Sequence, residues 1–385
     1  MKTRLFTLMA LVLGMASCQK DMAPAAESCG EVAVSLSVAT PELGVTRAGV
    51  DGEDDFVNGH DSAYGAIDYL SDAEWANDAD LRYSLEVYDV VNGVVDLTKP
   101  IKDRMVQIVD KYQPVKFELR LIPNRVYQFV VFADFVPEGT ADVEVNYNNQ
   151  ANLGLRHTIG TYLTDIKVKH NDDAINDELA DAYFKTFSYE PTNNTQNNIN
   201  DTENVILQRP YGKVRVVATD LADLNINVDP KSVEVTYSNV TVPTTFNAVT
   251  GVVGTEKSTR TFTFNYVDNI RDNHEGHVYT IGYDALTATA DNGAVRDSHL
   301  TLFTDYILAS ENQHAISFEM TTYDELGAPI KTVDFNTDIP VQRNHLTTII
   351  GNVMTAANEV TVKIDDNFAN AGNLEDAPFF EEVEL

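Results

Sequence analysis

The chain has 385 residues, a formal net charge of −32 and 43% hydrophobic residues. This length allows two domains of ordinary size, and the apolar share is sufficient to build their cores. Such an acidic chain repels phosphates, which argues against a nucleic-acid-binding protein. The 2 cysteines are too few for a disulfide-rich scaffold or for a zinc site built from cysteines alone.

Residues 1–17 have the order of a bacterial export signal. A basic start at Lys2 and Arg4 leads into an almost wholly apolar stretch, residues 5–14, and Met-Ala-Ser then precedes Cys18. The apolar stretch is too short to span a bilayer of about 30 Å as a helix. The tetrapeptide ending at Cys18 resembles the lipobox of bacterial lipoproteins, which implies cleavage before Cys18 and attachment of acyl chains such as palmitate. A plain secretory signal, in which Cys18 has no role, is the alternative.

Alternating apolar and small residues mark the first predicted strand. Residues 31–40 read EVAVSLSVAT, and the apolar members of the alternation are Val32, Val34, Leu36 and Val38. A period of two predicts a strand with one buried face. Residues 19–30 before it are small and polar, which is typical of a tether.

Later stretches repeat this pattern, so the sequence predicts an all-β protein with few short helices. Alternation recurs in residues 81–90, 115–121, 262–266 and 300–308. Short strands separated by Asn, Asp, Gly and Pro turns favour β-sandwiches, and the absence of a short repeat argues against a solenoid or a propeller. The almost wholly polar residues 192–204 are predicted to be a linker or a long loop.

Catalytic and metal-binding motifs are missing from the sequence. It contains no G-x-S-x-G, P-loop or H-E-x-x-H motif. His274 and His277 are predicted to be loop histidines, because Gly276 between them favours a turn. The acidic loop 51–55 could bind calcium loosely, but an ordinary exposed acidic loop is the favoured interpretation, and residues 365–376 fail the EF-hand pattern. We therefore expect no metal, no cofactor and no enzymatic activity.

Four stretches together resemble one known family. They are PNRVYQFVVFADFV (123–136), LQRPYGKVRVVATDL (207–221), IPVQRNHLTTIIGNVMT (339–355) and EVTVKIDDNF (359–368). They are similar to Bacteroidales fimbrillin-type lipoproteins of the type V pilin superfamily, and the third stretch is the most specific. The resemblance extends over most of residues 31–370.

The resemblance implies two tandem transthyretin-like β-sandwich domains, residues 48–204 and 205–370. It also implies a cell-surface protein, exported as a lipoprotein to the outer membrane, that assembles with other fimbrial subunits, copies of itself included, and supports adhesion. A host-surface ligand is the further partner that adhesion implies. The alternative is a stationary surface lipoprotein, either a fimbrial anchor subunit or a glycan-binding accessory protein.

The family's maturation step points to Arg47. Fimbrillin-type pilins are cut by an arginine-specific surface protease in the loop after the first strand, and Arg47 is the only basic residue between Lys20 and Arg82. Its surroundings are small and polar, as in loops that proteases cut. We expect cleavage between Arg47 and Ala48, which makes residues 18–47 a propeptide that includes the first strand. An ordinary loop arginine is the alternative.

Loss of the first strand would open a groove for a strand from another subunit. The vacant edge would have unpaired backbone groups that template strand addition, and head-to-tail addition grows a filament. The resemblance places the donor at the C-terminus, residues 371–385, where Phe379, Val383 and Leu385 share one face and Phe380 lies on the other. Glu381 interrupts the apolar face, and the alternative is a tail that packs on its own domain.

Overall fold

The computed structural model of the protein describes a subset of the chain. The described residues are 30–40, 79–110, 113–140, 156–168, 180–193, 196–199, 205–218, 220, 223–224, 228, 230–237, 242–255, 257–258, 261–265, 287–288, 294–295, 300–355, 359–365 and 381–384. Several predicted features lie outside them: Cys18, Arg47, Ala48, the acidic loop 51–55, His274, His277, Phe379, Phe380 and Leu385.

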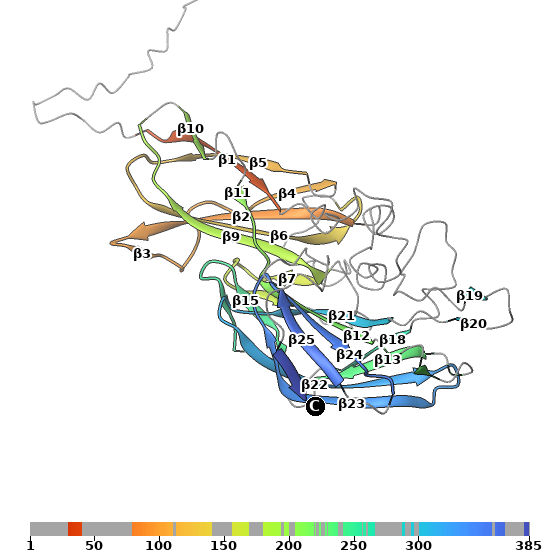
Figure 1. Cartoon of the computed structure of the whole chain (residues 1–385). Coiled ribbons are helices and arrows are strands. Elements are labelled where there is room, and N and C mark those ends of the chain that lie inside the picture. Colours follow the sequence, from red (N-terminus) through yellow and green to blue (C-terminus); the bar gives the residue numbers. More distant parts are fainter. Residues whose placement is uncertain are drawn as a thin grey trace, which may run out of the picture.

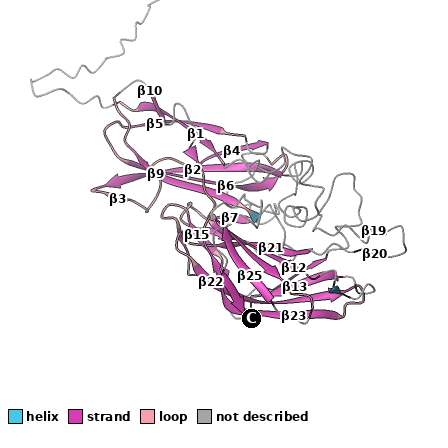
Figure 2. Cartoon of the chain, viewed as in Figure 1, coloured by secondary structure: helices cyan, strands magenta, loops and turns pink. Residues whose placement is uncertain are grey.

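Strands make up nearly all of the described structure, so the all-β prediction is confirmed (Figure 2). Two β-sandwiches follow one another along the chain (Figure 1). We call them the N-terminal sandwich, built from β1–β6 and β9–β11, and the C-terminal sandwich, built mainly from strands after residue 210. No helix in the described part of the chain is long and apolar enough to cross a membrane.

The N-terminal sandwich consists of two sheets. The first contains β1 (Val32–Ala39), β5 (Val115–Leu121), β10 (Gln196–Ile199) and β11 (Val205–Ile206). The second contains β2 (Ala79–Val91), β3 (Val94–Val95), β4 (Met105–Asp110), β6 (Tyr127–Pro137) and β9 (Ala182–Tyr189), in the order β3-β2-β6-β9 with β4 also paired to β2.

The predicted alternation is confirmed on β5, where only the core face is buried. On β2 the predicted apolar face lies in the core between the two sheets, but the other face, with Arg82 and Glu86, is buried as well. Leu81, Tyr83 and Leu85 of β2 are fully buried, as is Phe117 of β5. These side chains share one core cluster with the apolar face of β1.

The C-terminal sandwich also has two sheets. The first has the order β21-β12-β24-β25-β26 and contains β12 (Tyr211–Ala218), β21 (Leu300–Leu308), β24 (Leu346–Gly351), β25 (Glu359–Asp365) and β26 (Glu381–Glu384). The second has the order β18-β13-β22-β23 and contains β13 (Pro230–Thr236), β18 (Thr261–Asn265), β22 (His314–Asp324) and β23 (Pro329–Val341). Buried residues of both sheets form a separate core cluster that includes Val216, Val235, Phe318 and Ile349.

Three small sheets complete the fold. One contains β7 (His157–Ile159), β8 (Ile166–Val168), β15 (Thr245–Asn247) and β16 (Val252–Val253). The other two are the pair β14 (Val242–Pro243) with β17 (Lys257–Ser258) and the pair β19 (Thr287–Ala288) with β20 (Ala294–Val295). The first of these sheets joins chain segments far apart in sequence, since Ile166 of β8 pairs with Phe246 of β15.

A third core cluster lies between the two sandwiches. It brings Tyr88, Phe132 and Phe184 of the N-terminal sandwich together with Tyr211 and Tyr306 of the C-terminal one. The two sandwiches are therefore joined by a packed apolar layer, which we call the joint.

The polar stretch 192–204, predicted as a linker or loop, contains a strand. Gln196–Ile199 forms β10, which pairs with β1, and Val205–Ile206 continues along the same edge as β11. The domain boundary between residues 204 and 205 stays a prediction. β11 begins at Val205 and belongs to a sheet of the N-terminal sandwich.

Candidate strand-exchange site

Strand β1 lies inside its sheet and is paired along both of its edges. On one side it runs antiparallel to β5, with Leu36 opposite Phe117. On the other side it runs parallel to β10 and then to β11, with Leu36 opposite Ile199. Departure of β1 would therefore leave two unpaired edges that face each other across a gap one strand wide.

One face of β1 is buried in the core. Val34, Leu36 and Val38 are fully buried, while Val32 at the start of the strand is partly exposed. Burying each fully enclosed side chain contributes about 1.5–3 kcal/mol, or roughly 4–9 kcal/mol for the three, before the cost of chain entropy. The burial predicted from the alternation is confirmed for these three residues, and their displacement stays a prediction.

The opposite face of β1 has small polar residues beside charged ones on β5. The Ser35 hydroxyl donates a hydrogen bond of 3.1 Å to Glu118 Oε1. Lys116 Nζ lies 2.8 Å from the same oxygen, and its hydrogen bond is the main cause that lowers the pKa of Glu118. A carboxylate therefore lies directly against the polar face of β1.

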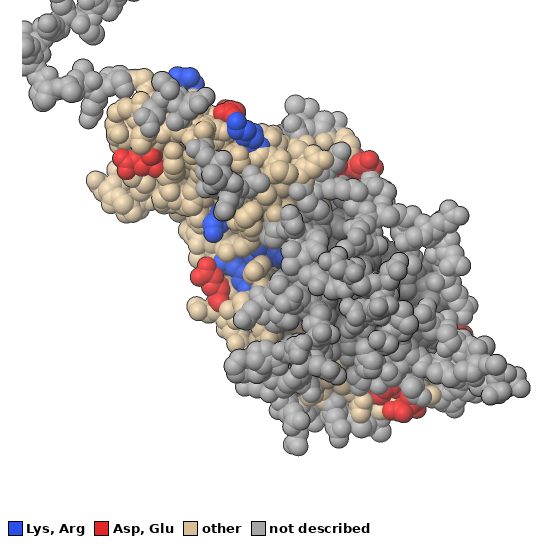
Figure 3. Space-filling model, turned by 45° about the horizontal axis from the view of Figure 1, so that its top comes forward, with Lys and Arg blue, Asp and Glu red and all other residues tan. Residues whose placement is uncertain are grey.

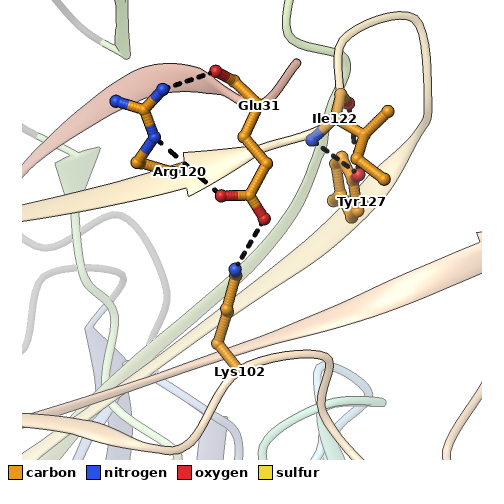
Figure 4. Close-up of polar contacts among 5 residues, drawn as sticks. All are labelled: Glu31, Lys102, Arg120, Ile122 and Tyr127. Carbon is orange, nitrogen blue, oxygen red and sulfur yellow. Dashed lines mark hydrogen bonds and ion pairs between the residues drawn. The ribbon is translucent and has the colours of Figure 1, made fainter. Parts of the chain in front are cut away.

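The start of β1 is held by two basic side chains (Figure 4). Arg120 Nη2 donates a hydrogen bond of 2.7 Å to the backbone oxygen of Glu31, and Lys102 Nζ lies 3.0 Å from Glu31 Oε1. All three side chains are substantially exposed, so each ion pair contributes about 0.2–1 kcal/mol. This clamp is weak compared with the buried face of β1.

Strand β5 is anchored to the rest of the sandwich independently of β1. The Tyr127 hydroxyl accepts a hydrogen bond of 3.2 Å from the Ile122 amide and donates one of 3.1 Å to the Ile122 oxygen, which closes the turn between β5 and β6 (Figure 4). Asn124 in this turn has a φ of 58°, and its amide donates to the Pro191 oxygen at 2.8 Å. Burial raises the pKa of Tyr127, so its hydroxyl keeps the proton that it donates.

The strands on the other side of β1 have anchors of their own. The Asn197 side chain of β10 accepts hydrogen bonds from the Thr192 amide at 2.8 Å and the Thr192 hydroxyl at 3.0 Å, and donates one to the Thr192 oxygen at 3.1 Å. Beyond β11, Gln208 and Phe184 exchange two backbone hydrogen bonds of 2.7 and 2.9 Å. β5, β10 and β11 have strand ladders only with β1 among the described strands, so these turn and side-chain contacts are what would hold the two walls to the sandwich once β1 leaves.

Two arginines from the resemblance stretches lie at the joint. Arg343 donates hydrogen bonds to the Ala309 oxygen at 3.0 Å and to the Gly251 oxygen at 2.6 Å, and its guanidinium lies over the ring of Phe184. Arg209 pairs with Asp181 at 2.6 Å and lies over the ring of Tyr183. Both arginines are buried. Arg343 contacts both sandwiches, whereas the ion pair and the ring contact of Arg209 are with residues of the N-terminal sandwich.

Asp134 of the stretch 123–136 belongs to another buried ion pair. Arg82 donates two hydrogen bonds, of 2.7 and 2.6 Å, to the carboxylate of Asp134. Burial alone would raise the pKa of Asp134, but Arg82 and His157 together outweigh burial and the pKa is lowered. His157 lies 3.5 Å from the same carboxylate, and its Nε2 is 2.6 Å from the hydroxyl of Tyr211, which links this pair to the C-terminal sandwich.

The C-terminal segment lies at the edge of its own sandwich. Strand β26 pairs antiparallel with β25, with Val383 opposite Val360. Val383 is the one predicted donor residue among those described, and it lies on the C-terminal sandwich rather than beside β1.

Sequence reasoning missed the anchors on both sides of β1. Asn197 was included in a predicted linker because Asn-rich segments favour loops, and the isolated Ile199 in that stretch was the available signal for a strand. Arg343 and Arg209 belong to the stretches that carry the resemblance, but no periodic pattern indicates their contacts.

The described residues offer no metal-binding group, since none of their His, Cys, Asp and Glu side chains cluster in threes at suitable positions. Lys and Arg, and Asp and Glu, occur in small separate groups on the described surface visible in Figure 3. The feature that stands out in the described part of the chain is a strand, β1, that is paired along both edges and buried on its apolar face.

The chain belongs to a protein family of unknown function (DUF6562), whose sequence profile matches residues 26–378. A comparison with curated proteins found no significant match.

Several solved structures are similar to the chain at low identity. The tip fimbrial protein Mfa3 of Porphyromonas gingivalis, crystallised with a C-terminal truncation, is 11% identical, with 87% of this chain and 98% of that one covered and a TM-score of 0.40. A protein of Bacteroides thetaiotaomicron described as a candidate adhesin is 12% identical, with 90% and 98% covered and a TM-score of 0.39. A protein of Parabacteroides distasonis described as a candidate cell adhesion protein is 11% identical, with 87% and 97% covered and a TM-score of 0.35.

Proposed function

We propose that this protein is a non-catalytic structural subunit of a cell-surface fimbria and assembles by exchange of its first strand. The observation that carries the proposal is the position of β1. Its apolar face is fully buried, yet the strands on either side have their own anchors, Tyr127 on one side and Asn197 on the other. Such a strand can be replaced by another of similar pattern while the sandwich persists.

Maturation in this proposal begins at the N-terminus. Acyl chains on Cys18 hold the exported protein at the outer membrane, and an arginine-specific protease then cuts between Arg47 and Ala48. The cut separates β1 from the chain that follows, so that β1 is retained only by non-covalent contacts. A strand supplied by a neighbouring subunit takes its place, and repeated addition builds the fimbria that supports adhesion.

The C-terminal segment, residues 371–385, is the donor in this proposal. Phe379, Phe380, Val383 and Leu385 supply its apolar side chains. Its antiparallel pairing with β25 shows that residues 381–384 can adopt a strand and add to a sheet edge. Donation requires the segment to leave β25.

One observation favours the alternative of a stationary surface lipoprotein. Strand β26 occupies an edge of its own sandwich, and a tail that stays there is not available to a neighbour. An anchor subunit, or a glycan-binding accessory protein, would keep Cys18 and its lipid for the lifetime of the protein.

The intact mass and first residue of the protein, sheared from the surface of its native host, test the proposal. A chain that begins at Ala48 is expected, and the matched variant Arg47→Lys should remain uncut because it keeps the charge but removes the arginine. A lipidated chain that begins at Cys18 in all of the wild-type material would overturn the proposal and leave the stationary lipoprotein.

A further inference from the structure

We infer that the slot occupied by β1 is built for a strand from a different protein rather than for the C-terminal segment of a second copy of this chain. The inference rests on the proposed function and names the partner of the same site. It contradicts the expectation of self-assembly and follows from the fit between the slot and the segment.

The slot sets three requirements, which β1 itself satisfies. Three successive inward positions, those of Val34, Leu36 and Val38, are closed to solvent, so each needs an apolar side chain. The two outward positions between them are filled by small residues, Ser35 opposite Glu118 and Ser37 opposite Lys116. Three residues before Val34, Lys102 and Arg120 pair with the carboxylate of Glu31, which favours an acidic residue there.

Residues 371–385 do not contain a matching pattern in either alternation phase. Side chains on one face of a strand come from every second residue. The odd-numbered series is Ala371, Asn373, Glu375, Ala377, Phe379, Glu381, Val383 and Leu385. The even-numbered series is Gly372, Leu374, Asp376, Pro378, Phe380, Glu382 and Glu384. The even-numbered series never has three apolar side chains in succession. In the odd-numbered series Glu381 separates Phe379 from Val383 and Leu385, so three do not occur in succession there either.

Every register in which residues 371–385 fill all three enclosed positions places a carboxylate in one of them. Placing Phe379 and Val383 inward puts Glu381 at the fully enclosed position of Leu36. Placing Val383 at the position of Leu36 and Leu385 at that of Val38 puts Glu381 at the position of Val34. Glu382 then takes the place of Ser35, opposite Glu118. A buried unpaired carboxylate is strongly disfavoured, and like charges directly opposite on neighbouring strands repel.

The occupant that the slot fits is therefore a strand of another fimbrial subunit with the pattern of β1. That pattern is an acidic residue followed by alternating apolar and small residues, with three apolar side chains in succession. The C-terminal segment of this chain then belongs in the slot of another protein, so neither neighbour in the fimbria is a second copy of this chain.

Strand exchange with synthetic peptides tests the inference. The protein from residue 19 is cut after Arg47, so that the fragment 19–47 stays bound through β1, and each peptide is then titrated against it while release of the fragment is measured. The peptides are residues 31–40, residues 373–385, and two variants of the latter, Glu381→Val and Glu384→Val. Glu381→Val makes the odd-numbered series apolar from Phe379 to Leu385. Glu384→Val also removes one negative charge but leaves Glu381 in that series.

The peptide 31–40 and the Glu381→Val peptide are expected to release the fragment. The native 373–385 peptide and the Glu384→Val peptide should be about 100-fold weaker or worse, as expected for an unpaired buried charge. If the native 373–385 peptide releases the fragment at the concentration needed for peptide 31–40, the inference is overturned and the proposed function stays intact. The same holds if the Glu381→Val and Glu384→Val peptides release the fragment equally well. Failure of every peptide, 31–40 included, would overturn the proposed strand exchange itself and the inference with it.

Discussion

The guanidinium of Arg343 lies over the ring of Phe184, with the central carbon 5.0 Å from the ring centroid. Phe184 belongs to β9 of the N-terminal sandwich, whereas Arg343 follows β23 of the C-terminal one. The same guanidinium donates hydrogen bonds to the backbone oxygens of Ala309 and Gly251. A single buried side chain thus contacts both sandwiches.

Replacing Arg343 should destabilise the joint. Arg343→Ala removes the cation–π contact and leaves two carbonyl oxygens without their donor, for an expected loss of about 2–4 kcal/mol in the free energy of unfolding. Arg343→Lys keeps the charge but lacks the planar fork, so about half of that loss is expected. Urea unfolding measures both values.

Lys116→Ala is the matched control for a surface cation, because Lys116 is 61% exposed. It should change the free energy of unfolding by less than about 0.5 kcal/mol. If Arg343→Lys unfolds at the same urea concentration as the wild type, the guanidinium contacts do not stabilise the joint.

The Arg82–Asp134 pair should make stability depend on pH. Asp134→Asn leaves the buried Arg82 without its counter-charge, which is expected to cost about 3–5 kcal/mol at pH 7. Because the pKa of Asp134 is lowered in the folded protein, its contribution is complete above the unfolded value of about 3.9 and is lost as the pH falls through the lower folded value. The gap between wild type and variant should therefore be constant from pH 7 to about pH 5 and narrow below about pH 4.

Urea unfolding at a series of pH values from 7 to 2.5 measures this gap. Asp103→Asn, at an exposed carboxylate on the same sandwich, should follow the wild-type curve throughout. A gap between wild type and Asp134→Asn that stays unchanged down to pH 2.5 would contradict the role assigned to Asp134.

Periodic patterns in the sequence predicted the sheets well, because alternation depends only on which face of a strand meets the core. Leu36 on β1 and Phe117 on β5 were placed on buried faces by this rule, and both are fully buried. The alternation rule did not predict strand β10, because asparagines such as Asn197 and Asn198 are typical of loops. In the structure Asn197 uses its amide to hold Thr192, a contact that depends on a turn and not on hydrophobic alternation.

The joint could not be predicted from local sequence for a different reason. Arg343 and Phe184 are far apart along the chain, and their contact arises only after both sandwiches have formed. The resemblance stretches marked Arg343 and Arg209 as part of distinctive sequences but gave no partner for either. A contact between a charged and an aromatic side chain that are far apart in the sequence produces no periodic pattern, so a single sequence does not reveal it.

The turn between β5 and β6 should lose stability when the Tyr127 hydroxyl is removed. Tyr127→Phe keeps the buried ring and leaves the Ile122 amide and oxygen without this partner, for an expected loss of about 1–2 kcal/mol. Hydrogen exchange at the Ile122 amide should accelerate by more than exchange in β24. Tyr323→Phe, at a partly exposed tyrosine of the other sandwich, serves as control, and equal exchange at Ile122 in both variants would contradict the anchoring role.

Truncating Leu36 should loosen β1 without unfolding the whole protein. Leu36→Ala leaves a cavity in the core beneath β1, and such changes cost about 2–5 kcal/mol. Because β5 and β10 have their own anchors, much of this loss should appear as local release of β1, with faster hydrogen exchange in β1 and β5 and little change in β24. Ser37→Ala, on the outward face of the same strand, should leave both regions unchanged. Uniform acceleration across both sandwiches in Leu36→Ala would mean that β1 unfolds only together with the rest of the protein, which is incompatible with its role as an exchangeable strand.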